Sequence, residues 1–104
     1  LLFSKDGGNT FGKPVRIDEG NPKGRVDISL MEDSVAYVSW LEKDIIKLTR
    51  VNDQGVKGKS IQIAETSAKR SSGFPQLTKD GKDLVMAWTD DRDSLQIKTV
   101  RVIF

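Results

Sequence analysis

The side chains of this sequence that could do chemistry are carboxylates, arginines, lysines, serines and a single tyrosine. The chain contains no Cys and no His, so a thiol nucleophile, a Cys/His zinc site and a Ser-His-Asp triad are excluded within it. The densest acidic run is Asp90-Asp91-Arg92-Asp93, which lacks the Gly and the terminal Glu of an EF-hand calcium loop. We interpret this run as an acidic hairpin loop, and we expect neither a metal nor an organic cofactor.

The composition narrows the classes of partner. The chain has 104 residues, of which 31% are charged and 37% hydrophobic, as expected for one compact unit with a modest core. No apolar run approaches the ~20 residues of a membrane-spanning helix. The net charge is +2, and basic residues alternate with acidic ones along the chain. Without a basic stripe, we expect no nucleic-acid partner and no membrane partner.

Two-residue alternation dominates the sequence, and no segment shows a helical period. Nine short strands separated by Gly-, Asn- and Asp-containing turns predict an all-β sandwich, barrel or propeller. A change of phase near the C-terminus, between Ile97 and Val100, is consistent with a bulge. The expected strands are Leu1–Ser4, Lys13–Ile17, Arg25–Met31, Val35–Glu42, Ile45–Val51, Ser60–Ala64, Phe74–Lys79, Asp83–Thr89 and Leu95–Ile103.

A repeat with a period near 48 residues decides among these architectures. Two Trp residues each end an apolar strand and are each followed by an acid two positions later. A later strand matches an earlier one at a similar spacing, and so do two D-x-G turns. A four-stranded propeller blade has a period of this length. The matching pairs are Trp40 with Trp88, Ile46–Val51 with Ile97–Val102, and Asp6–Gly8 with Asp53–Gly55.

The repeat predicts an incomplete propeller of about two four-stranded antiparallel blades, forming one unit over residues 1–104. Residues 1–20 would supply strands C and D of one blade, 21–66 a full blade, and 67–104 strands A to C of the next. A closed propeller needs ~4–8 blades. We therefore expect the rest of a propeller, or self-association through apolar edge strands, to complete the fold.

One motif carries a resemblance to a known family. The run from Ser4 to Phe11 reads S-x-D-G-G-x-T-F, which suits a hairpin because Asp6 can accept hydrogen bonds from turn amides. Ser4 and Thr10 can lock its ends, and Phe11 can pack into the blade interior. The run resembles the Asp-box, or BNR repeat, of sialidase (neuraminidase)-like β-propellers. The resemblance implies a structural staple, made of Ser4, Asp6, Gly8, Thr10 and Phe11, on the face away from any active site.

The same resemblance implies that ligands bind at the opposite strand ends, near the central channel. Sialidases hold a substrate carboxylate with arginines, whose guanidinium matches it bidentately. Arg25 and Arg70 stand where two inner strands begin, and Asp27 and Asp90 are placed at the same strand ends. These four are our candidates for binding a glycan or sialic-acid-like ligand. The alternative is that each arginine pairs with a local acid such as Asp27 or Glu65.

Catalytic residues are left unassigned. Sialidases generally use a Tyr nucleophile. The single Tyr, Tyr37, stands in mid-strand, where we expect it to lie in the blade interior or at a contact between blades rather than at the channel mouth. Trp40 and Trp88 could stack on sugars, but their places in apolar strands favour packing between blades. We therefore expect this chain alone to be non-catalytic.

Two functional hypotheses remain at this point. The first is a non-catalytic portion of a sialidase-like, BNR-repeat protein that binds or hydrolyses glycans, placed by resemblance in the periplasm or outside the cell. The second is an interaction or scaffold propeller that self-assembles, in which three copies would make six blades.

Overall fold

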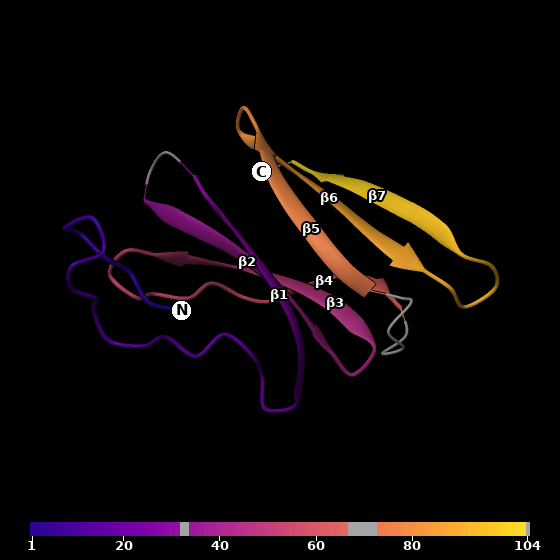
Figure 1. The fold of residues 1–104 in the computed structure, drawn as a ribbon, viewed down its shortest axis with the longest axis horizontal. Helices are drawn as coiled ribbons and strands as arrows, with labels where there is room; N and C mark the ends of the chain where they lie inside the picture. The colour runs from indigo at the N-terminus through magenta and orange to yellow at the C-terminus, as the bar shows by residue number, and fades with distance from the viewer. Residues whose placement is uncertain (32–33, 67–72, 104) are drawn as a thin grey trace.

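Strands account for all the regular structure in the computed structural model of this chain, which describes residues 1–31, 34–66 and 73–103 (Figure 1). Its seven strands form two antiparallel sheets, and the described part contains no helix. The predicted all-β, antiparallel class is confirmed. The strands are β1 (Pro22–Leu30), β2 (Val35–Glu42), β3 (Ile45–Asn52), β4 (Ile61–Glu65), β5 (Gly73–Asp80), β6 (Asp83–Asp90) and β7 (Gln96–Val102).

The order of strands in each sheet follows the order in the chain. The first sheet is β1-β2-β3-β4 and the second is β5-β6-β7. Tight turns produce this order: Lys43 and Asp44 have positive φ values of 54° and 60°, which matches the right-handed twist of the two strands they join. Gly81, with φ 62°, lies in the turn between β5 and β6, where a residue without Cβ avoids strain.

The apolar core lies between the two sheets. Because successive side chains of a strand point to opposite faces, every second residue of β2, β3 and β6 enters it. Each large side chain buried here stabilises the fold by ~1.5–3 kcal/mol. The expectation that Tyr37 lies in the interior is confirmed, since it is 8% exposed. The cluster consists of Tyr37, Leu41, Ile46, Leu48, Leu84, Met86 and Trp88.

The other face of the first sheet, which we call its N-terminal face, is partly covered. Val38 and Trp40 point to this side and are 2% and 1% exposed, and Leu1 and Val15 of the N-terminal segment line the same hollow as they do. The segment also lies beside the residues that connect β3 to β4, since Phe3 and Val15 line a second hollow with Asp53 and Gly55. Both Trp residues are buried, so their predicted place in the packing rather than on an open surface is confirmed.

The two strands expected within residues 1–20 do not form as regular strands. Three backbone hydrogen bonds join them instead: Leu1 N to Val15 O (3.0 Å), Val15 N to Leu1 O (2.8 Å) and Gly12 N to Phe3 O (2.8 Å). Pro14 cannot donate a backbone hydrogen bond, and the pairing is only a few residues long. The segment is therefore a loosely paired hairpin.

The bulge expected in the last strand is also wrong. β7 pairs with β6 in continuous register from Gln96 opposite Asp90 to Val102 opposite Leu84. The change of phase arises because Ile97 points away from the core and is 77% exposed. Register shifts occur instead near the starts of β1 and β5, between Pro22 and Asp27 and between Gly73 and Gln76.

Candidate functional site

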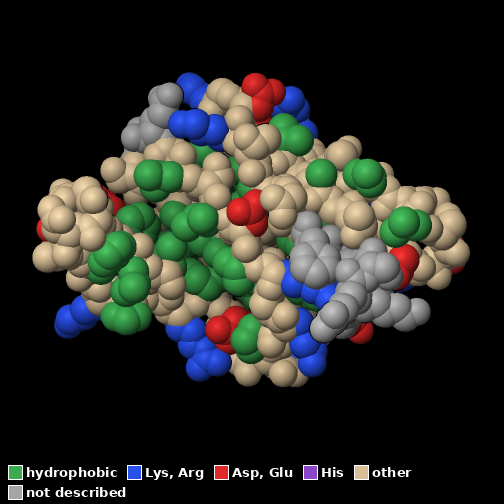
Figure 2. Space-filling model, in the orientation of Figure 1, with side chains coloured by type: hydrophobic (Ala, Val, Ile, Leu, Met, Phe, Trp, Pro, Cys, Tyr) green, Lys and Arg blue, Asp and Glu red, His purple; other side chains and the backbone are tan. Residues whose placement is uncertain are grey.

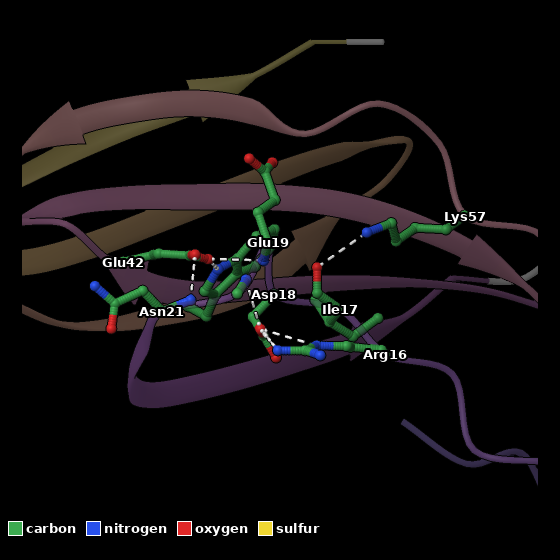
Figure 3. A network of polar contacts seen from close by, with 9 residues as sticks. Arg16, Ile17, Asp18, Glu19, Asn21, Glu42 and Lys57 are labelled. Atoms are coloured by element: carbon green, nitrogen blue, oxygen red, sulfur yellow. Dashed lines mark hydrogen bonds and ion pairs between the residues drawn. The ribbon is translucent and has the colours of Figure 1, made fainter.

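Glu42, at the end of β2, is the centre of a buried polar network (Figure 3). Its Oε1 accepts hydrogen bonds from the indole Nε1 of Trp40 (2.8 Å) and the backbone amide of Glu19 (2.9 Å). Its Oε2 accepts one from the backbone amide of Asn21 (2.9 Å). Glu42 is only 1% exposed. One carboxylate therefore fixes the connection between the N-terminal segment and β1.

Local sequence brings these groups together. Trp40 and Glu42 stand two positions apart in β2 and so share its N-terminal face. Lys47 lies directly opposite Trp40 in β3, because the two-residue turn sets the register. Its Nζ is 3.2 Å from Glu19 Oε2, and its side chain is 9% exposed while that of Glu19 is 47% exposed. The network thus ends in an ion pair at the surface.

Further contacts fix the same connecting segment (Figure 3). Asp18 Oδ1 accepts hydrogen bonds from the amide of Gly20 (2.9 Å) and from the Arg16 guanidinium, whose Nη2 is 2.9 Å away. Lys57 Nζ donates to the carbonyl oxygen of Ile17 (3.1 Å). Asp18 therefore fixes the shape of the segment, and Lys57 joins the segment to the connection between β3 and β4.

The environment of Glu42 keeps it ionised. Burial by itself would raise its pKa, but the amide of Glu19, the indole of Trp40 and the amide of Asn21 all stabilise the charged form, and Lys47 adds attraction. The net result lowers the pKa of Glu42 from 4.5 to about 2. The carboxylate carries no proton to donate near neutral pH, and its oxygens are already occupied by donors.

The second sheet repeats the arrangement with an Asp in place of the Glu. Trp88 and Asp90 stand two positions apart in β6, and Lys98 of β7 lies opposite Trp88. Lys98 Nζ is 3.0 Å from Asp90 Oδ2, and Arg92 Nη2 is 2.9 Å from the same oxygen. Arg92 also donates its amide to Asp90 Oδ1 (3.1 Å). Hydrogen bonds from Arg92 and then Lys98 lower the pKa of Asp90 strongly.

The shorter side chain changes one contact. Trp40 Nε1 donates to the acid two positions later, whereas Trp88 Nε1 has no hydrogen-bond partner among the described residues. Asp has one methylene fewer than Glu, and in this copy Arg92 binds the carboxylate through Nε as well (3.0 Å to Oδ1). Asp90 is therefore 4% exposed and saturated by cations of its own hairpin.

The ligand-binding candidates named from the sequence lie in both sheets, and the contacts of two of them are defined. Asp27 lies in β1 and bridges the two sheets: its Oδ2 accepts a hydrogen bond from the amide of Leu77 in β5 (2.7 Å), and its Oδ1 one from the amide of Ile28 (2.9 Å). Arg25 lies beside it, half-buried, at a register shift and with φ 56°. Asp90 is bound to Arg92 and Lys98 in the second sheet. Arg70 lies outside the described residues.

The run from Ser4 to Thr10 forms the hydrogen bonds expected of it. Asp6 Oδ1 accepts from the amide of Thr10 (2.9 Å) and Oδ2 from its hydroxyl (2.5 Å). Ser4 Oγ donates to Asp6 Oδ1 (2.8 Å) and accepts from the amide of Gly8 (2.8 Å). Gly7 and Gly8 have φ values of 72° and 93°, which a side chain would strain. The hydroxyl and amide of Thr10 and the hydroxyl of Ser4 lower the pKa of Asp6 to about 2.

One expectation about this motif is wrong. Phe11 was expected to enter the blade interior, but it is 58% exposed. It follows the staple at Thr10 and lines a shallow surface hollow with Phe3 and Asp53. Among the described strands, none covers the hairpin on that side, so no apolar layer is available to bury the ring.

The second D-x-G turn is held by a residue that the sequence pattern did not single out. Asn52, not Asp53, provides the staple: its Oδ1 accepts from the amides of Gln54 (3.0 Å) and Val56 (2.9 Å). Asn52 reaches the amide four positions later, as Asp6 does. The Lys47 contact was missed too, although a Lys opposite each Trp in the repeat would have indicated it.

The contacts described for these groups are structural ones. The pKa is lowered in five described carboxylates, whereas the acid of a glycosidase has a raised pKa; the five are Asp6, Asp18, Glu19, Glu42 and Asp90. Tyr37 is in the core rather than at a strand end. Within residues 1–31, 34–66 and 73–103, no three acidic side chains are grouped to hold a metal ion.

Among the described residues, no helix is long and apolar enough to cross a membrane. Comparisons with protein-family models, with curated proteins and with solved structures found no match to this chain.

Proposed function

We propose that this chain is a non-catalytic portion of a sialidase-like, Asp-box β-propeller whose parent protein binds or hydrolyses glycans outside the cytoplasm. The observation that carries the proposal is the Asp-box hairpin, in which Asp6, Ser4 and Thr10 form a closed set of hydrogen bonds. The motif resembles that of the family in all its defining positions, and its hydrogen bonds support the resemblance. The Asp-box acts here as a staple and not as a catalytic group.

The way the sheets meet also supports a propeller. In a propeller, the innermost strands of neighbouring blades converge around the axis. Here the sheets approach each other where β5 lies against β1 and β2 (Figure 1), and Asp27 joins β1 to the Leu77 amide at that point. The shared Trp, acid and Lys constellation of the two sheets fits consecutive copies of one blade.

Sialoside hydrolysis tests the non-catalytic assignment. The purified chain should release no fluorophore from a 4-methylumbelliferyl sialoside, because Tyr37 is buried and no described carboxylate has a pKa that is shown to be raised. A sialidase assayed in parallel serves as the positive control. Turnover that exceeds the buffer rate, and that is lost when Tyr37→Phe is introduced into a chain that still folds, would overturn the proposal.

A self-assembling scaffold is the second candidate. It is favoured by the apolar residues Leu95, Ile97 and Ile103 near the β7 edge, which are 70%, 77% and 74% exposed. Exposed apolar edges of this kind pair with other chains. Light scattering on the eluted protein separates the two: a monomer supports the first proposal, and a discrete trimer supports the scaffold.

A further inference from the structure

The N-terminal face of the first sheet is only half covered. The N-terminal segment lies over the β2–β3 side, but along β1 the side chains of Val26, Ile28 and Leu30 are 65%, 47% and 59% exposed. Three large apolar side chains at alternate positions of one strand form an exposed hydrophobic patch, which in proteins commonly marks an interaction site. Figure 2 shows hydrophobic side chains gathered between the N-terminal segment and β1.

A groove runs along this uncovered strip. Its volume is about 430 Å³, and it lies between the N-terminal segment and β1. Its floor is made by Val38 and Trp40, which are buried. The lining is largely apolar, with Leu1, Val15, Ile17, Pro22, Val26 and Ile28 around it. A surface of this composition fits apolar side chains of another protein segment better than a polar ligand.

The second sheet shows what covers the same surface in the next copy of the repeat. Ile28 lies opposite Val38, and Leu77 lies opposite Met86, so the two pairs occupy equivalent positions. Leu77 is packed against the core, and its strand, β5, lies against β1 and β2. In the second sheet, therefore, the surface around Leu77, which is equivalent to the exposed strip of β1, is covered by β1 and β2 of the first sheet.

Part of the N-terminal face is already taken by the N-terminal hairpin. Leu1 and Val15 line the groove beside Val38 and Trp40, and Val15 and Ile17 lie next to Gly55 and Lys57 in the connection between β3 and β4. A second copy of the chain could not place its three-stranded sheet there in the same register without displacing Leu1–Ser4. The exposed edge of that segment is available for pairing, because no hydrogen bond joins the backbone of Leu2 to any described residue.

We propose that this groove is the docking surface for a two-stranded antiparallel β-hairpin with the apolar pattern of β1 and β2, which would supply strands A and B of the blade whose strands C and D are the N-terminal hairpin. The inference rests on the proposed propeller. The second strand of the incoming hairpin adds to the free edge at Leu2 by backbone hydrogen bonds. Its apolar side chains cover Val26 and Ile28, as Tyr37 and Leu41 cover the second sheet.

The test attaches a β1–β2 hairpin covalently to the full chain and measures whether it docks in the groove. A second copy of residues 20–44, which contains β1 and β2, is joined to Leu1 through a flexible Gly/Ser linker of about eight residues, long enough to place no demand on register. Hydrogen exchange is followed residue by residue by NMR. Docking should slow exchange of the Leu2 amide at least tenfold, raise the midpoint of thermal unfolding and reduce binding of an apolar dye.

Two matched controls make the result specific. In the first, Tyr37→Ser and Leu41→Ser are introduced only in the added copy, and protection at Leu2 should disappear. In the second, Ile28→Lys in the body of the chain should abolish docking, whereas Leu95→Lys, at an equally exposed apolar position outside the groove, should not. Both body positions are exposed, so the variants should still fold.

The outcomes separate this inference from the propeller on which it rests. If the added hairpin protects Leu2 no more than its serine control, or protects it despite Ile28→Lys, the docking surface is refuted. The amide of Leu77 in the unmodified chain reports on the stacking of the two sheets through Asp27. Fast exchange at Leu77 would refute the stacked blades themselves, whereas slow exchange there with an unprotected Leu2 refutes the docking surface alone.

Discussion

Replacing Glu42 by Gln should destabilise the protein because the carboxylate is buried and accepts three hydrogen bonds. Gln keeps the size of the side chain, but its amide nitrogen has only donors to present. One of the backbone amides that now bind Glu42, from Glu19 or Asn21, would face that nitrogen and lose its acceptor. The substitution also removes the negative charge that attracts Lys47.

Two routes give the magnitude of the effect. A pKa lowered from 4.5 to about 2 corresponds to about 3 kcal/mol of stabilisation of the ionised form at neutral pH, at ~1.4 kcal/mol for each pKa unit. A buried donor without an acceptor costs ~1–3 kcal/mol. We expect Glu42→Gln to lower the free energy of unfolding by about 2–3 kcal/mol at pH 7, a large share of the stability of a small domain.

Urea unfolding followed by circular dichroism measures this difference. The pH dependence gives a second check. Because the folded-state pKa of Glu42 lies below the unfolded value, its contribution is complete above pH ~4.5 and is lost as the pH falls toward 2. The difference between wild type and Glu42→Gln should therefore shrink to roughly half by pH 3. Glu65→Gln is the matched control, since that side chain is 81% exposed and its nearest cation is 3.8 Å away.

Two results would refute this reasoning. One is a Glu42→Gln variant whose free energy of unfolding at pH 7 lies within about 0.5 kcal/mol of wild type, as expected for an exposed acid. The other is a difference that stays constant from pH 7 to pH 3, because the loss would then come from shape rather than from charge.

Three further predictions concern the turns and the second sheet. Asn52→Ala should cost about 1 kcal/mol in urea unfolding and Asp53→Ala almost nothing, because the Asn52 side chain holds the turn; equal losses would contradict this. Asp6→Ala should speed hydrogen exchange at the Thr10 amide, and the wild-type protection should fade as the pH drops from 3.8 toward 2; unchanged exchange in the variant would show that Asp6 is not the acceptor. Asp90→Asn should lower the midpoint of thermal unfolding, and high salt should narrow the gap to wild type because the loss is of cation pairing.

Much of the fold could be predicted from local patterns. Alternation and turn residues placed all seven regular strands to within a few residues, because the side-chain period of a strand is visible in the sequence. The repeat also indicated that Trp40 and Trp88 occupy equivalent places, each with a Lys on the neighbouring strand. The local pattern did not predict that residues 1–4 and 13–17 pair only weakly. That weakness arises because the short hairpin forms only a few backbone hydrogen bonds.

The candidate site was harder to predict because it depends on partners distant in sequence. Asp27 looks like an exposed acid at a strand end, and only the stacking of β5 on β1 places the Leu77 amide beside it. Glu42 acquires its low pKa from the amides of Glu19 and Asn21, some twenty positions earlier. No sequence motif predicts these contacts. Nearly every residue has a backbone amide, and only the tertiary structure determines which amides lie within hydrogen-bond distance of a carboxylate.

The sequence by itself determined the strands, the turns, the hydrogen-bonded staple from Ser4 to Thr10 and the absence of Cys and His chemistry, because each of these depends on the residue types or on neighbours within a few residues. Only the tertiary structure decided which face of each strand is covered. Phe11 and Ile28 are apolar residues whose sequence context favours burial, yet both are largely exposed. Burial is a property of what lies opposite a side chain, and that is set by the stacking of the sheets rather than by the residue or its neighbours.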